Sequence, residues 1–147
     1  AAHVAAMDAG GRTIAVVGTP LEVAYPAENA SLHARLAAEQ LLVSQFRPGT
    51  PISPKNFPIR NRLMTLLTDA TVILEAAEKS GTIQQGWEVL RLGRLLFLLE
   101  NLTQRSDLAW PKEMLRHGAQ VLKRENLQHM IENLPATSVA QEIAADA

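Results

Sequence analysis

Apolar residues along this chain follow two alternating patterns. Short, nearly continuous apolar runs, typical of parallel strands buried on both faces, lie at 13–17, 41–44, 71–74, 95–99 and 120–122. Amphipathic helical spacing is found in the segments 32–39, 60–68, 83–92, 111–117 and 124–133, and a short helix precedes Gly10 and Gly11. Strands that alternate with helices in this way predict an α/β fold with an open, doubly wound, mainly parallel, Rossmann-like sheet of about five strands and flanking helices.

The same pattern sets the expected domain organisation. With 147 residues, of which 47% are hydrophobic, the chain is large enough to bury a core of its own. We expect residues 1–134 to form one domain and the small and polar segment 135–147 to be a linker or tail. Because the chain opens on a helix without an initiator methionine, we expect it to be a piece of a longer protein. The run 95–99 is either an inner strand or an edge strand that pairs across a dimer.

Composition excludes several classes of protein. A formal net charge of -1 excludes a globally basic nucleic-acid binder, and the absence of cysteine excludes disulfides, thiolate nucleophiles and cysteine-based metal sites. The four histidines are scattered without the spacing of metal ligands, so we expect neither a metal nor a cofactor. The apolar runs are too short to span a membrane and no export signal opens the chain, so the expected location is the cytoplasm.

One local segment departs from the apolar pattern. The stretch "PISPKNFPIRNR", residues 51–62, carries Lys55, Arg60 and Arg62, and no acidic residue lies between Glu39 and Asp69. A patch of this kind can hold a polyanion even on a chain without net positive charge. Phe57 lies among these cations and can stack on an unpaired base, which favours single strands.

Local geometry strengthens this expectation. Pro58 suits the first turn of a helix, which we expect to run over 59–67. Arg60 and Arg62 then fall in that first turn, where the helix dipole disfavours cations and a bound phosphate would offset the penalty. The alternative is that Phe57 packs as a hydrophobic staple while the arginines form a solvated face. Tyr25, in "VAYPAEN", is expected in a loop at the sheet edge, a place that also suits the rim of a ligand site.

A second candidate element is "EKSGT", at 78–82. It follows a predicted strand and precedes a helix, which is where open parallel sheets bind their ligands. Gly81 permits a positive φ and close backbone approach, and the hydroxyls of Ser80 and Thr82 can donate to a phosphate. An ordinary Ser or Thr N-cap would give the same sequence.

Three longer segments resemble one family. The stretches "AGGRTIAVVGTPLEVAYPAEN" (9–29), "PGTPISPKNFPIRNR" (48–62) and "VILEAAEKSGT" (72–82) resemble the DprA/Smf family of DNA-processing proteins in order and spacing. The resemblance implies a non-catalytic Rossmann-like domain that binds single-stranded DNA, forms a homodimer and helps to load RecA recombinase onto incoming DNA in natural transformation and recombination. The nucleic-acid-binding residues are then expected to be Lys55, Asn56, Phe57, Arg60, Asn61, Arg62, Ser80, Gly81 and Thr82.

The chain departs from the family pattern in two places. Family members carry two more strands upstream, including a Gly-Ser-Arg phosphate loop, which this sequence does not contain. After Thr82 the usual Thr-Ala and Val-Pro-Gly are replaced, Gly93 and Arg94 alone keep the expected place, and the match is weak from residue 99 onward.

Two other functions remain open at this point. One is a nucleotide-binding enzyme similar to the phosphoribohydrolases that act on nucleoside monophosphates, which need a "PGGxGT"-type loop followed by a glutamate. The corresponding place here reads "AEKSGTIQQ", with a single glycine. The other is a purely structural or regulatory dimerisation domain.

Overall fold

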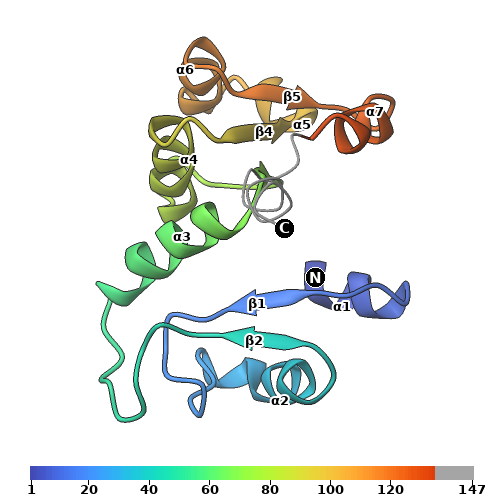
Figure 1. Ribbon diagram of the computed structural model, residues 1–147. Helices are drawn as coiled ribbons and strands as arrows, with labels where there is room; N and C mark the ends of the chain where they lie inside the picture. The colour runs from blue at the N-terminus through green and yellow to red at the C-terminus, as the bar shows by residue number, and fades with distance from the viewer. Residues whose placement is uncertain (135–147) are drawn as a thin grey trace, which may run out of the picture. The chain divides into compact units, whose positions relative to one another are not determined.

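The structure is a computed structural model that describes residues 1–134, and the predicted tail, 135–147, lies outside the described residues. The chain divides into two compact units, the first comprising Ala1–Leu63 and the second beginning at Met64. Each unit is described by itself (Figure 1).

The first unit is built on two parallel strands. Its elements in chain order are α1 (Ala2–Asp8), β1 (Ile14–Val16), η1 (Ala27–Asn29), α2 (Ala30–Glu39), β2 (Leu41–Val43) and the first part of α3 (Asn56–Leu67). Ala15 pairs with Leu42 across the strands, and Ala15 is buried with Met7 of α1 and Leu36 of α2. The neighbouring pair, Ile14 and Leu41, is 57% and 52% exposed. Burial on both faces, as the sequence predicts, is therefore wrong for β1 and β2.

The second unit is a three-stranded parallel sheet with helices on both faces. Its elements after α3 are β3 (Ala70–Ile73), α4 (Gly81–Arg91), β4 (Leu95–Leu99), α5 (Glu100–Thr103), α6 (Trp110–Arg116), β5 (Gln120–Leu122) and α7 (Leu127–Glu132). The strand order is β3-β4-β5, so β4 is the inner strand, and its residues Leu96, Phe97 and Leu98 are buried.

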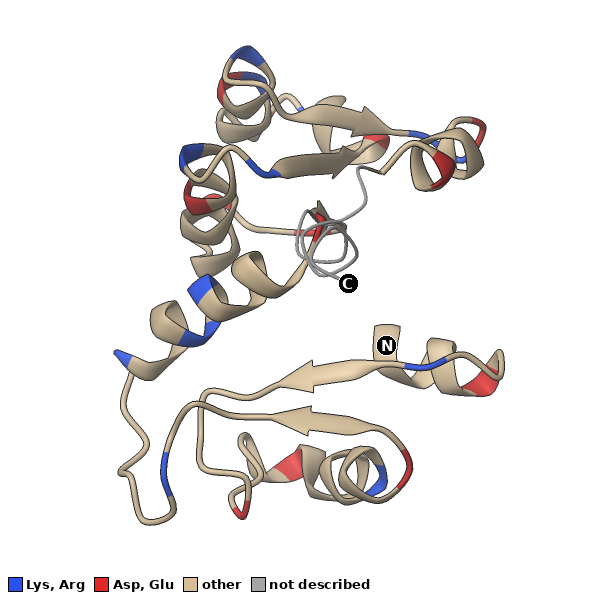
Figure 2. Ribbon diagram, in the orientation of Figure 1, with Lys and Arg blue, Asp and Glu red and all other residues tan. Residues whose placement is uncertain are grey.

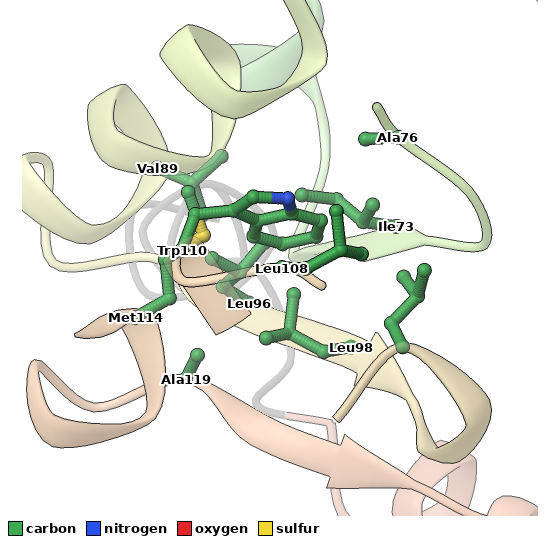
Figure 3. Packing of buried hydrophobic residues seen from close by; sticks show 10 residues of the cluster. Ile73, Ala76, Val89, Leu96, Leu98, Leu108, Trp110, Met114 and Ala119 are labelled. Carbon is green, nitrogen blue, oxygen red and sulfur yellow. The ribbon is translucent and has the colours of Figure 1, made fainter. Parts of the chain in front are cut away.

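One face of this sheet carries the main core of the unit. Ile73, Leu96 and Leu98 point toward α4, α5 and α6, and Figure 3 shows the Trp110 ring in the middle of this cluster. A Cβ at Gly86 of α4 would lie 2.8 Å from Cε of Met114, so this glycine lets α4 pack closely against α6. On the other face, Val72 and Phe97 lie beside α7.

The predicted α/β fold with parallel strands is confirmed. The expected strands are β1 to β5, and they pair in two sets, β1-β2 and β3-β4-β5. Two short elements, η1 and α5, were not predicted, because three or four residues are too few to show helical periodicity. A third difference, the start of α3, changes how the candidate site is built.

Candidate nucleic-acid interface

Helix α3 begins at Asn56, three residues earlier than the expected start at 59. The Asn56 side chain is 7% exposed, and its Nδ2 donates a hydrogen bond to the carbonyl oxygen of Pro51 at 3.2 Å. Its backbone N–H donates to the carbonyl oxygen of Ser53 at 3.0 Å, which closes a turn just before the helix. Asn56 thus anchors the loop onto α3, and its expected contact with nucleic acid stays a prediction.

The early start removes one argument made from the sequence. Pro58 is the third residue of α3, still among the positions whose N–H has no partner within a helix. Arg60 and Arg62 are the fifth and seventh residues, beyond the first turn, where the effect of the helix dipole has faded. The prediction that these arginines lie in the first turn is therefore wrong, and the dipole gives no reason to expect a phosphate at them.

Arg60 instead joins α3 to the end of β1. Its Nη1 donates to the carbonyl oxygen of Val16 and its Nε donates to Oδ1 of Asn61, each at 2.9 Å. Burial of the side chain lowers the pKa of Arg60 from its usual value. A guanidinium group has five N–H donors, so two hydrogen bonds leave capacity for a further acceptor such as a phosphate oxygen.

Phe57 packs against the loop that follows β1. A Cβ added to Gly18 would lie 3.0 Å from Cδ1 of Phe57, so only glycine lets the ring come this close. The Arg60 guanidinium lies 5.9 Å from the centroid of the ring, and Phe57 is half-buried. Phe57 thus packs against its own fold, but from within α3 rather than as a staple ahead of the helix, and its stacking on a base stays a prediction.

Tyr25 is the exposed aromatic residue of this site. Its ring centroid lies 5.6 Å from that of Phe57 at an interplanar angle of 42°, and Tyr25 is 54% exposed. The sequence placed Tyr25 correctly in a loop, but it gave no sign of the contact with Phe57. We call Tyr25, Lys55, Phe57 and Arg60 the aromatic patch.

Hydrogen bonds hold the two loops that flank this patch. Ser44, which follows β2, donates from Oγ to the carbonyl oxygen of Thr19 at 2.6 Å and accepts from the N–H of Phe46 at 3.0 Å. Thr19 is buried, and its Oγ1 donates to the carbonyl oxygen of Val23 at 2.7 Å. The loops thus meet at the carboxyl ends of β1 and β2, the edge at which parallel sheets bind ligands.

The loop before α3 and α3 itself carry cations, and Glu22 of the β1 loop brings a carboxylate to the same edge, where its Oε1 accepts a hydrogen bond from the N–H of Gly49 at 3.1 Å. Lys55 and Arg62 are exposed, and Figure 2 shows blue Lys and Arg positions but no red Asp or Glu position along α3 and the loop before it. Arg47, in the same loop, adds another exposed cation. An exposed ring beside cations can bind an unpaired base and its phosphate together.

The Ser80 turn lies in the second unit, after β3 and before α4, as predicted. Ser80 is the N-cap of α4, and its Oγ accepts a hydrogen bond from the N–H of Thr82 at 3.1 Å. Gly81 is the first helical residue and does not have a positive φ, so that part of the prediction is wrong. A Cβ at Gly81 would meet no atom within 4 Å, so the backbone there is open to close approach. The Ser80 hydroxyl proton also stays available to an acceptor.

The predicted site residues therefore fall in two groups. Phe57 and Arg60 lie together with Tyr25 in the first unit, Asn61 accepts a hydrogen bond from Arg60, and Lys55 directly precedes α3. Ser80, Gly81 and Thr82 form a separate turn in the second unit. A single groove that combines both groups stays a prediction.

Within residues 1–134, no three His, Asp or Glu side chains are grouped closely enough to hold a metal ion. In the same part of the chain, no helix has both the length and the apolar character needed to cross a membrane.

Comparison with known proteins gives consistent matches. The family model described as DNA recombination-mediator protein A matches residues 1–135. Protein Smf of Synechocystis is 34% identical over 125 residues, which cover 85% of this chain and 31% of that protein. DNA processing protein DprA of Bacillus subtilis is 28% identical over 137 residues, which cover 93% of this chain and 46% of that protein.

Solved structures agree with these matches. The X-ray structure of DNA processing protein A from Streptococcus pneumoniae superposes with a TM-score of 0.81 at 29% identity, covering 92% of this chain and 47% of that one. The protein from Helicobacter pylori, whose structure is described in terms of its single-stranded DNA binding mode, has a TM-score of 0.72 at 23% identity and supports the fold. The chain spans less than half the length of the two curated relatives and of the Streptococcus structure.

Proposed function

Because the chain belongs to the DNA recombination-mediator protein A family, we propose that it binds single-stranded DNA as part of a longer DNA-processing protein. The observation that carries the proposal is the aromatic patch at the carboxyl ends of β1 and β2. An exposed Tyr25 ring is backed by Phe57 and the neighbouring Arg60 guanidinium, which belong to a segment, 40–68, that contains no acidic residue. Bases in a duplex stack on one another, so such a ring suits an unpaired strand.

Each residue of the patch has its own part in the proposed binding. Tyr25 offers its exposed ring to a base, while Phe57 holds that ring in place from the packed side. Lys55 supplies an exposed charge for the phosphate backbone, and Arg62 another. Arg60 fixes α3 against β1 and turns its remaining N–H groups to a phosphate oxygen.

The Ser80 turn is proposed as a second contact with the strand. The Ser80 hydroxyl donates to a phosphate oxygen there, with Thr82 beside it, and the open space at Gly81 admits the phosphate to the start of α4. Because this turn belongs to the second unit, its contribution is tested separately from that of the aromatic patch.

The test of the proposed function is a competition experiment. A fluorescently labelled oligo-dT strand is bound to the chain at low salt and displaced with unlabelled single-stranded or duplex DNA of the same length. Single strands are expected to displace the label at lower concentration. Failure of labelled oligo-dT to bind at low salt contradicts the proposal.

The wider roles expected of the longer protein are also proposals. We infer that it acts in the cytoplasm on incoming DNA in natural transformation and recombination, as a homodimer that passes the strand to RecA. The support is membership of the family and the names of its relatives, which are DNA-processing proteins. The expected absence of catalysis stays a prediction, and release of free base from a nucleoside monophosphate would contradict it.

A further inference from the structure

A hollow of about 400 Å³ lies beside α4 and α6 in the second unit, and its lining resembles a small ligand site. It is lined by Trp87, Leu90 and Arg91 of α4 and by His117 at the end of α6. The volume falls at the lower end of the range for ligand pockets. We propose that this hollow, the Trp87 site, binds a nucleobase with its 5′-phosphate. The proposal uses no residue of the aromatic patch.

The side chains of Trp87 and His117 contact each other in the lining of this hollow. Their ring centroids are 5.2 Å apart and the rings meet edge to face, at an interplanar angle of 82°. Trp87 is half-buried, and the covered part of its side chain packs against the core cluster that contains Val89, Leu96 and Met114. The part of the indole that faces the hollow, beside His117, offers an aromatic surface that suits a planar ring.

The hydrogen bond of His117 decides what the imidazole can recognise. Its Nδ1 lies 2.8 Å from the carbonyl oxygen of Glu113, and because a carbonyl only accepts, Nδ1 carries the proton. In the neutral ring Nε2 is then an acceptor. The exocyclic amino group of adenine or cytosine can donate to it, whereas thymine lacks such a group and has only its ring N3–H, between two carbonyl groups, to donate.

Arg91 supplies the contact for a phosphate. Its side chain is 74% exposed, with Nη1 3.3 Å from Oε2 of Glu88. A guanidinium group has further N–H donors that suit phosphate oxygens. Arg91 also lies in the last turn of α4, and the His117 N–H covers a terminal carbonyl of α6, so the helix ends expose less negative charge toward an anion.

The first experiment separates Trp87 from the other tryptophan of the chain. The sequence contains two tryptophans, and Trp110 is buried, so a Trp110→Phe variant, checked by circular dichroism, reports emission from Trp87 alone. Titration with dAMP is expected to quench this emission to saturation, and dTMP is expected to bind at least about threefold more weakly. Equal binding of dAMP and dTMP would overturn the role given to His117.

Variants of the otherwise native chain are then compared by calorimetry with dAMP. We expect Trp87→Leu to weaken binding about tenfold or more, as loss of a stacking contact does. Arg91→Ala is expected to weaken dAMP binding about fivefold and to leave adenosine binding unchanged. Its matched control is Arg116→Ala, since Arg116 is 70% exposed and pairs with Glu113 in the same i,i+3 geometry outside the hollow.

The source of the nucleotide is distinguished by a second set of titrations. Binding of dAMP identifies a free mononucleotide as ligand, whereas binding of oligo-dA alone, weakened by Trp87→Leu, identifies a nucleotide within a strand. If neither ligand changes Trp87 emission, or if Trp87→Leu binds both as the parent does, the Trp87 site is overturned. A Tyr25→Ala variant must still bind at this site, which separates this proposal from the proposed function.

Discussion

Tyr25 and Phe57 form a pair of aromatic rings that differ in how much of each side chain is exposed. Phe57 is held between Gly18, Tyr25 and the Arg60 guanidinium, whereas Tyr25 is 54% exposed. Stacking on a base requires a free face, so the stacking residue is inferred to be Tyr25 and the supporting residue Phe57. From the sequence alone, Phe57 was the candidate because it lies among the cations.

The first prediction at the residue scale concerns Tyr25 itself. Replacement by alanine removes the proposed stacking surface, worth about 1–3 kcal/mol, so the Kd for oligo-dT should rise about 5- to 150-fold. Tyr25→Phe keeps the ring and should bind nearly as the parent chain does. Fluorescence anisotropy measures both constants, and an unchanged Kd for Tyr25→Ala would remove Tyr25 from the site.

The second residue-scale prediction concerns Arg60. Its hydrogen bond to the Val16 carbonyl and its partial burial give it a structural role that exposed Lys55 does not share. Arg60→Ala should lower the free energy of unfolding by about 1–3 kcal/mol, because the partly buried carbonyl of Val16 loses a charged donor. Lys55→Ala is the control and should change it by less than about 0.5 kcal/mol. Urea denaturation compares them, and equal midpoints would contradict this role for Arg60.

At the scale of elements, the contact between the β1 loop and α3 depends on Gly18. A methyl group there would stand 3.0 Å from the Phe57 ring. We expect Gly18→Ala to cost about 1–3 kcal/mol of stability, since a rigid ring cannot yield as a flexible chain can. Adding Phe57→Leu should recover part of the loss. A Gly18→Ala chain as stable as its parent in thermal unfolding would show that the loop relaxes freely.

The start of α4 gives a second prediction at this scale. Ser80 caps the helix through the Thr82 N–H, so Ser80→Ala should cost about 1 kcal/mol of stability. Ser80→Asp keeps the cap and should preserve stability, but its negative charge would repel a phosphate. Weaker oligo-dT binding by a stable Ser80→Asp chain is expected. Unchanged affinity would make the Ser80 turn a helix cap only.

Local periodicity predicted the elements well and their contacts poorly. The helix before Gly10 and the strand 95–99 are found as predicted, because short-range spacing of apolar residues determines them. The start of α3 was misplaced because the Asn56 amide binds Pro51, which no apolar pattern encodes. The contacts of Arg60 with Val16 and of Phe57 with Gly18 join segments far apart in sequence. The local spacing of apolar residues therefore could not predict these contacts.

At the scale of the whole molecule, the sequence predicted parallel strands but not how they pair. The division into β1-β2 and β3-β4-β5 depends on pairing between strands that lie far apart in sequence. The alternation of strands and helices along the chain does not determine which strands pair. The domain extent of 1–134 and the tail after it stay predictions. The same holds for the groove that would join the aromatic patch to the Ser80 turn.

The most direct measurement is the competition between single-stranded and duplex DNA for bound, labelled oligo-dT, made at about 50 mM and about 200 mM salt. Stacking on Tyr25 requires unpaired bases, so the single strand should displace the label at a concentration at least about tenfold lower than the duplex does at each salt concentration. Affinity for both should fall as salt rises, because the proposed contacts of Lys55 and Arg62 with phosphates are ionic. Equal displacement by duplex and single strand, or no binding of oligo-dT at the lower salt, would contradict a single-stranded DNA site on this chain.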